Sequence, residues 1–267
     1  MSYVEPGSGW PEDPAAPTTP VAHSAGDVVR LAGNAPTLDH VEARVSVCRA
    51  CPRLVEWRER VATEKRAAFR DEPYWGRPIP GWGDPAGRIL VLGLAPAAHG
   101  GNRTGRIFTG DRSGDWLFAA LHRAGFARLA TSERAGDGQR LTDVRIAAAV
   151  RCAPPANAPT PEERDACRPW LARELAFMRP RLRVVVVLGG FGWAALWPAL
   201  QAAGYEVPAR RRRFGHLAEV ELPPQPHIPG VLVLGCYHPS QQNTFTGKLT
   251  EAMLDAVFDR ARAALES

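Results

Sequence analysis

Three polar side chains occur in loops where they could take part in acid-base chemistry. Asp111 lies in the stretch FTGDRSGDWLF, directly after the glycine-containing loop GLAPAAHGGNRTGRI. His238 precedes a proline, and Asn157 lies in a proline-rich stretch. A carboxylate or an imidazole can move a proton or stabilise developing charge, but an aspartate before a helix can equally serve as its cap. The residue types therefore predict a polar site and leave Asp111 open between catalyst and cap, since Ser113 could also cap the helix.

Four of the five cysteines form a pattern suited to a metal centre. Cys48 and Cys51 form a C-x2-C pair, whereas Cys152 and Cys167 follow much later and far apart from each other. Zinc fingers and ribbons use two close pairs, so this spacing fits a four-thiolate iron-sulfur cluster better, because a larger cluster can join distant segments. A zinc site and four unrelated buried thiols remain as alternatives to the cluster at this point. Cys236 lies in an apolar run, and we interpret it as a core residue.

Apolar runs bounded by glycine or proline predict four buried strands. They cover residues 88–96, 143–152, 183–190 and 231–239. Because helical segments alternate with them, we expect an α/β fold, a three-layer sandwich in which helices flank a central, four-stranded, mostly parallel sheet. Ligands of such sheets bind at the carboxyl ends of the strands. The loops that carry Asp111, Asn157 and His238 each follow a predicted strand, so we expect them to converge at one edge.

Helical spacing and composition define the rest of the chain. Residues 38–69 have helical apolar spacing that is interrupted near Pro52, which predicts two helices that meet at the first cysteine pair. Further helices are predicted at residues 113–124, 161–178, 190–203 and 247–264. Residues 1–36 are rich in Pro, Ala, Gly and Ser, which predicts a disordered tail before a single domain at residues 37–267.

Charge and hydropathy bear on the partner and on membrane contact. The net charge of +5 suits a polyanionic partner, although only Lys65 and Lys248 are lysines and abundant arginine also follows from biased genome composition. Residues 184–200 carry no charge, but a β-branched run, two glycines and a proline favour a strand, a turn and a helix over a membrane span. Because the N-terminus lacks the features of a secretory signal, we expect a cytoplasmic protein without membrane contact.

The loops and the cysteines together resemble the family 5 uracil-DNA glycosylases, the UDGb type of the uracil-DNA glycosylase superfamily. GLAPAAHGGNRTGRIFTGD and HPSQQNTFTGKLT are long and specific stretches, RCAPPANAPTPEE supports them, and the resemblance covers about residues 40–260. It implies a 4Fe-4S cluster held by Cys48, Cys51, Cys152 and Cys167. It also implies removal of uracil and other deaminated bases from DNA in base excision repair, by a nucleoid-associated monomer.

The chemistry of base removal suggests a role for each polar residue. Cleavage of an N-glycosidic bond leaves an electron-poor sugar and an anionic base, so it needs a carboxylate near the sugar and donors near the base oxygens. Ala97 and Ala98 occupy the place where other branches of the superfamily have a polar residue, so Asp111 is the expected carboxylate. We expect His238 to donate to a base oxygen. The resemblance favours an active-site role for Asn157, which would reach the base or water.

A base inside the DNA stack must be flipped into a site with an aromatic face. The resemblance assigns this face to Phe108, with Ala95 also at the base. The loop against the DNA is expected to contain Ser240, Gln241, Gln242 and Asn243, with Thr246 and Lys248 at phosphate. Glycosylases that also cut the strand attack the sugar with an amine. Because Lys65 is predicted far from the ligand edge and Lys248 at a phosphate, the resemblance together with the lysine count predicts a monofunctional enzyme.

Two other classes of protein compete with this interpretation. A nucleotide-binding module would explain a glycine-containing loop after the first strand, but that loop has no lysine and neither of the usual phosphate-binding patterns. A non-enzymatic, zinc-stapled DNA-binding protein is favoured by the charge and by nothing in the loops. Colour separates this alternative from the enzyme, because iron-sulfur proteins are brown and zinc proteins are colourless. The sequence leaves open the choice among uracil, hypoxanthine, xanthine and ethenocytosine.

Overall fold

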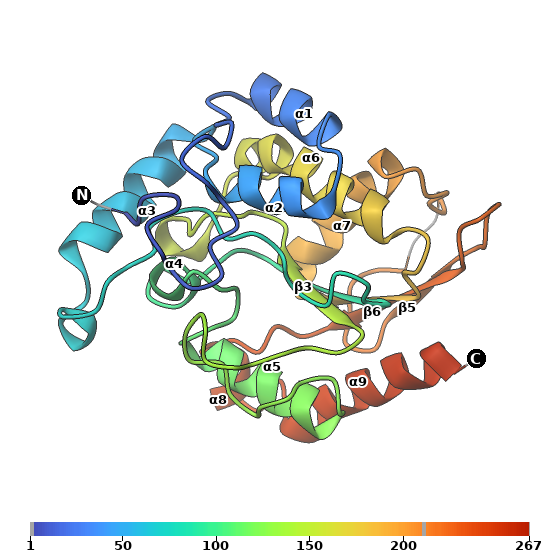
Figure 1. The fold of residues 1–267 in the computed structure, drawn as a ribbon. Coiled ribbons are helices and arrows are strands. Elements are labelled where there is room, and N and C mark those ends of the chain that lie inside the picture. The colour runs from blue at the N-terminus through green and yellow to red at the C-terminus, as the bar shows by residue number, and fades with distance from the viewer. Residues whose placement is uncertain (1–2, 210–211, 267) are drawn as a thin grey trace.

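A single mixed sheet lies at the centre of the structure, a computed structural model that describes residues 3–209 and 212–266 (Figure 1). Its strands follow the order β1-β3-β2-β4-β6-β5. The bounds are β1 Trp82–Gly83, β2 Ile89–Gly93, β3 Val144–Ala148, β4 Val184–Leu188, β5 Glu219–Leu222 and β6 Val231–Cys236. The four inner strands are parallel, as predicted, while β1 and β5 pair antiparallel at the two edges. The predicted count of four strands is therefore wrong, because these short edge strands carry no long apolar run.

Helices cover both faces of the sheet, which confirms the predicted layers. Figure 1 shows α1, α2, α6 and α7 on one side and α5 and α9 on the other, and contacts between α6 and α7 and between α5 and α9 agree. The bounds are α1 Ala25–Gly33, α2 Leu38–Ser46, α3 Pro52–Glu64, α4 Gly101–Thr104, α5 Arg112–Arg123, α6 Pro161–Met178, α7 Gly190–Ala202, α8 Gln241–Phe245 and α9 Glu251–Glu266. Short 3-10 turns cover Ala67–Phe69 and Pro155–Asn157.

Alternating strand residues fill the two halves of the core. Val91 and Val186 belong to the cluster shared with α5 and α9, whereas Leu90 and Val185 belong to the cluster shared with α6 and α7. All four side chains are fully buried. Each contributes roughly 1.5–3 kcal/mol by leaving water. This two-sided core makes the sheet a rigid platform for the loops at its carboxyl edge.

The uncharged stretch at residues 184–200 has the predicted structure. Strand β4 ends at Leu188, Gly189 turns the chain with a φ of +94°, and α7 follows with Pro198 inside it. No helix within residues 3–209 and 212–266 is both long and apolar enough to cross a bilayer. The two helices predicted around Pro52 are also confirmed, because Pro52 is the first residue of α3.

The N-terminal stretch differs from the predicted disordered tail. Ser24 caps α1 by accepting from the Asp27 backbone N–H, and Val28 and Leu31 of this helix are buried. Upstream of α1, the Asp13 carboxylate pairs with Arg77 over 2.8 Å, and both side chains are almost fully buried. The composition of residues 1–36 hides these features, since a Pro- and Ala-rich average says nothing about one capped amphipathic helix or one buried ion pair.

Candidate active site

Phe108 and His238 meet at the carboxyl edge of the sheet. Phe108 comes from the loop after β2 and His238 from the loop after β6, and their ring centroids lie 5.8 Å apart. The Phe108 ring packs on Gly93, where an added Cβ would lie 2.8 Å from the ring. Phe108 has a φ of +49°. A non-glycine residue in this left-handed region is strained, so the surrounding loop must hold the ring in place.

His238 is a neutral imidazole in this position. Burial lowers the pKa of His238 to about 4, so the ring carries no charge near pH 7. Gly189, directly after β4, packs next to it, since an added Cβ there would be in ordinary contact with the His238 Cβ at 3.5 Å. The His238 carbonyl accepts from the Asn243 side-chain amide over 2.9 Å. A neutral ring at a strand end can donate an N–H to an oxygen that becomes negative.

Asp111 caps helix α5 and also faces the first loop. Its Oδ1 accepts from the Gly114 backbone N–H over 3.0 Å, and α5 begins at Arg112, so Asp111 and not Ser113 caps this helix. An added Cβ at Gly100 would lie 2.1 Å from Oδ2. Burial raises the pKa of Asp111, while the N–H groups of Gly114 and Ser113 act in the opposite direction. Cap and catalyst therefore do not exclude each other, because the capping contact uses one oxygen only.

Within the described residues, Asn157 makes no ring contact or hydrogen bond with Phe108 or His238. It ends an exposed 3-10 turn with a φ of +55°, and its side chain makes no hydrogen bond to another described residue. Ala95 is closer to the pair in the chain, in the partly buried loop after β2. The Leu94 carbonyl of that loop accepts from the Val150 N–H over 3.0 Å, which ties the loops after β2 and β3 together. The predicted convergence of these loops is confirmed, but no contact brings the Asn157 amide to the rings.

Several polar side chains of the loop after β6 form hydrogen bonds within the loop itself. Ser240 caps α8, and the Asn243 amide holds the His238 carbonyl. The Thr246 hydroxyl donates to the Gln242 carbonyl over 2.7 Å. Ser240, Asn243 and Thr246 therefore shape the loop, whereas the Gln242 side chain is exposed.

An aromatic side chain that sequence reasoning missed lies on the same exposed surface. Phe245, the last residue of α8, is 67% exposed, and the Arg112 guanidinium lies 4.4 Å from its ring centroid. Gln241 and Lys248 are also exposed, and the Lys248 ammonium lies 5.0 Å from the Tyr237 ring centroid. A lone phenylalanine in the polar stretch QQNTFTG was the available signal. An exposed aromatic ring beside a guanidinium suits contact with nucleic acid.

The four patterned cysteines line one cavity between the α2–α3 junction, the loop after β3, and α6. Burial raises the pKa values of Cys48, Cys51 and Cys167, and the neighbouring Cys152 raises them further. In the part of the chain that the structure describes, no three Cys, His, Asp or Glu side chains form a group able to hold a metal ion. Cys236 is fully buried in β6 and lies outside this cavity, as predicted.

Two buried arginines also line the cysteine cavity. Arg58 is 1% exposed and donates from Nη1 to the Cys152 sulfur over 2.9 Å. Arg151 is 2% exposed and pairs through Nη2 with Glu174, which is itself fully buried. Among the described residues, Arg58 Nε and Arg151 Nε and Nη1 have no hydrogen-bond partner. Unpaired buried donors are costly, so cations with free N–H groups beside four thiols favour an anionic group in the cavity.

The comparisons with known proteins agree with this arrangement of loops. The model of the uracil DNA glycosylase superfamily matches residues 80–262. The type-5 uracil-DNA glycosylase of Mycobacterium tuberculosis is 57% identical over 98% of this chain and 94% of its own length. The chain belongs to the type-5 uracil-DNA glycosylases. Those of Thermus thermophilus and Pyrobaculum aerophilum are 49% and 44% identical, each over 82% of this chain and over 94% and 90% of their own lengths.

Membership in the type-5 uracil-DNA glycosylases covers both regions described above. The superfamily match includes Phe108, Asp111 and His238, together with Cys152 and Cys167. The first cysteine pair precedes that match but lies within a chain that aligns almost completely with the mycobacterial relative. The type-5 family therefore extends to the N-terminal helices that complete the cysteine cavity.

Proposed function

We propose that this protein is a monofunctional DNA glycosylase that removes uracil and other deaminated bases, the first step of base excision repair. The observation that carries the proposal is the meeting of Phe108 and His238 at the carboxyl edge of the sheet, in a chain of the type-5 family. A base stacked on Phe108 would lie within reach of the imidazole. Asp111 follows Phe108 in the same turn, on the side of the first loop.

His238 acts on the departing base. As the glycosidic bond breaks, negative charge develops on a base oxygen, and the neutral imidazole donates an N–H to it. Removal of one such donor costs about 10²–10³ in rate, or roughly 2.7–4 kcal/mol. The low pKa of His238, about 4, keeps the ring neutral, so it acts as a hydrogen-bond donor to the departing base and not as a general acid.

Asp111 acts on the sugar. One oxygen stays bound to the Gly114 N–H and fixes the carboxylate at the start of α5. The other oxygen stabilises the cationic sugar and orients the attacking water. Asn157 is proposed to complete the site from the loop after β3, with Ala95 beside the base, once DNA is bound.

Water, and no lysine, attacks the sugar. Lys65 donates to the carbonyls of Arg70 and Glu72 over 3.2 and 2.7 Å, and so its ammonium is used within the N-terminal half. Lys248 is exposed beside the Tyr237 ring and is proposed to bind phosphate. An ammonium that stays charged is no nucleophile, which leaves an intact abasic strand as the product.

The cysteine cavity is proposed to hold a 4Fe-4S cluster on Cys48, Cys51, Cys152 and Cys167. Four thiols around one cavity are a suitable donor set, and the free N–H groups of Arg58 and Arg151 suit the negative charge of a thiolate-bound cluster. When bound, the cluster supplies a covalent link among three segments and takes no part in base removal. We propose that the protein binds DNA as a monomer through Gln241, Gln242, Phe245 and Lys248.

A glycosylase assay tests the proposal. Oligonucleotides that carry uracil, hypoxanthine, xanthine or ethenocytosine, each single- and double-stranded, are incubated with the protein and compared with a thymine control. The proposal predicts release of free uracil, at least, from a strand that breaks only after alkali. Binding to all of these oligonucleotides without release of any base would instead identify a non-enzymatic DNA-binding protein.

A further inference from the structure

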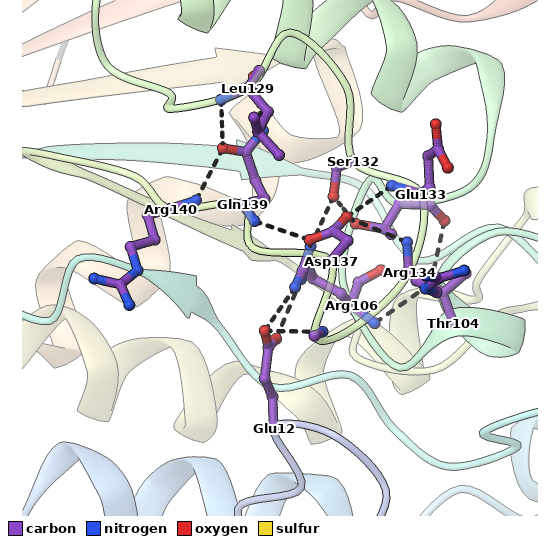
Figure 2. Close-up of polar contacts among 12 residues, drawn as sticks. Glu12, Thr104, Arg106, Leu129, Ser132, Glu133, Arg134, Asp137, Gln139 and Arg140 are labelled. Carbon is purple, nitrogen blue, oxygen red and sulfur yellow. Dashed lines mark hydrogen bonds and ion pairs between the residues drawn. The ribbon is translucent and has the colours of Figure 1, made fainter.

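The N-terminal strap, residues 4–13, lies against the loop that carries Phe108. Figure 2 shows Glu12 of the strap below Arg106, with Asp137 on the other side of the guanidinium. Glu12 accepts from Arg106 Nη2 over 2.6 Å and from Nε over 3.2 Å. Asp137 accepts from Arg106 Nη1 over 2.7 Å. Arg106 is 1% exposed, so its position depends on both carboxylates.

The contacts continue from Arg106 to the two residues that follow Phe108 in the chain. Arg106 Nη1 also donates to the Ser132 hydroxyl over 3.0 Å, and this hydroxyl lies 2.7 Å from that of Thr109. The Gly110 N–H donates to the Ser132 carbonyl over 3.0 Å. Phe108 therefore lies between an arginine held by the strap and two residues held by Ser132.

Other contacts fix the strap itself. An added Cβ at Gly105 would lie 2.8 Å from the Trp10 indole nitrogen, so strap and loop touch directly. Glu12 also accepts from the Trp82 indole N–H over 3.0 Å. Asp13 forms the buried ion pair with Arg77. Removal of one partner of such a pair lowers the free energy of unfolding by about 3–5 kcal/mol. The strap is thus a firmly bound part of the domain.

The backbone of Phe108 is strained and needs contacts that hold it in place. A φ of +49° costs of order 1–3 kcal/mol and persists only where the surroundings impose it. Arg106 lies two residues before Phe108, and the strap anchors it from a segment distant in the sequence. Without Glu12, Arg106 keeps only Asp137 of its two carboxylate partners. We then expect the turn at Phe108 to become more mobile.

We infer that Glu12 is a positioning residue for base capture: through Arg106 and Ser132 it holds Phe108 in the orientation that stacks on the flipped base. This inference rests on the proposed function. It assigns to the N-terminal strap a part in the reaction, although no strap residue reaches the paired rings.

A double-mutant cycle tests the inference. Single-turnover uracil release is measured for the wild type, Glu12→Ala, Phe108→Ala and the double variant, with Glu5→Ala as the matched control because Glu5 is an exposed carboxylate on the same strap. Glu12→Ala is expected to slow release roughly 10-fold. The same change is expected to cost less than about 2-fold once Phe108 is absent. Glu12→Gln, which keeps the acceptor oxygen, should recover part of the rate.

Hydrogen exchange gives a second readout that does not depend on activity. The Gly110 N–H should lose protection in Glu12→Ala and keep it in Glu5→Ala. Equal rates in the wild type and Glu12→Ala, an equal loss in both Phe108 backgrounds, or unchanged protection at Gly110 would overturn the inference. A wild type that releases no base would refute the proposed function, while the exchange result would still decide whether Glu12 holds the Phe108 turn.

Discussion

The rings at the sheet edge and the cysteine cavity satisfy their polar groups in opposite ways. At the edge, Asp111 already caps a helix, and the carbonyl of His238 already binds the Asn243 amide. In the cavity, Arg58 and Arg151 keep free N–H groups although they are almost fully buried. The fold itself therefore positions Asp111 and His238 at the edge, whereas the free N–H groups in the cavity favour an anionic ligand.

This difference predicts how each region responds to damage. A site whose geometry is fixed by the fold can lose one catalytic group and remain folded, so the loss falls on the rate. A cavity whose buried cations need a ligand loses folding energy when the ligand is lost. Substitutions at the two regions should therefore separate into effects on activity and effects on stability.

The largest effect is expected at the cysteines. Cys48→Ala should lose the brown colour and most of the soluble yield, because the proposed cluster would join the N-terminal helices to α6. Cys236→Ala is the control, since this thiol is buried in β6 outside the cavity. Iron content and visible absorption of the purified proteins are the measurements. A wild-type protein that contains zinc and no iron would contradict the proposed iron-sulfur cluster.

The next effect is expected at Asp111. Asp111→Ala should lower the single-turnover rate roughly 10²-fold while DNA affinity stays within a few-fold, because the carboxylate acts mainly in the transition state. Gly100→Ala should also slow the reaction, since the added Cβ would lie 2.1 Å from Asp111 Oδ2 and displace it. Near-normal turnover in Asp111→Ala would leave this residue as a cap only.

A smaller effect is expected from pH. Both proposed catalysts are active in their deprotonated forms, so the rate should fall as the pH falls. Burial raises the pKa of Asp111 above its usual value and lowers that of His238 to about 4, so both groups contribute to the acid limb. In Asp111→Asn only the His238 titration remains, so the acid limb of this variant should differ from that of the wild type and lie near pH 4. An unchanged acid limb in this variant would assign the titration to another group.

The smallest effect is expected at Lys248. Lys248→Ala should weaken DNA binding modestly and leave the rate of base release unchanged, because an exposed cation at phosphate contributes little to the chemical step. Borohydride added during the reaction should trap no adduct between the wild type and DNA. A trapped adduct that disappears in Lys248→Ala would show that this lysine attacks the sugar.

The inner part of the fold could be predicted from the sequence, because continuous apolar runs are typical of parallel strands buried on both faces. The edge strand Trp82–Gly83 has two residues and no periodicity to detect. Helix α1 was missed although Ser24 and Asp27 provide a cap signal, since the surrounding composition outweighed it. Local signals near helix starts therefore deserve more weight than the average of a segment.

The candidate site could be predicted in its residue types but only partly in its geometry. Strand ends place Phe108 and His238 together, and parallel topology is enough to foresee this. The choice between Asp111 and Ser113 as the cap stayed open, because either residue satisfies the preference for a polar N-cap. The ion pair between Glu12 and Arg106 joins distant parts of the chain. No local sequence pattern predicts such a contact.

His238 provides the most direct test of the account. Single-turnover uracil release and DNA affinity are measured side by side for the wild type and His238→Ala, in preparations of equal iron content. The account predicts release that is roughly 10²-fold slower in the variant, with affinity within a few-fold of the wild type. Equal rates in the two proteins would contradict the claim that the Phe108 and His238 edge carries out base removal.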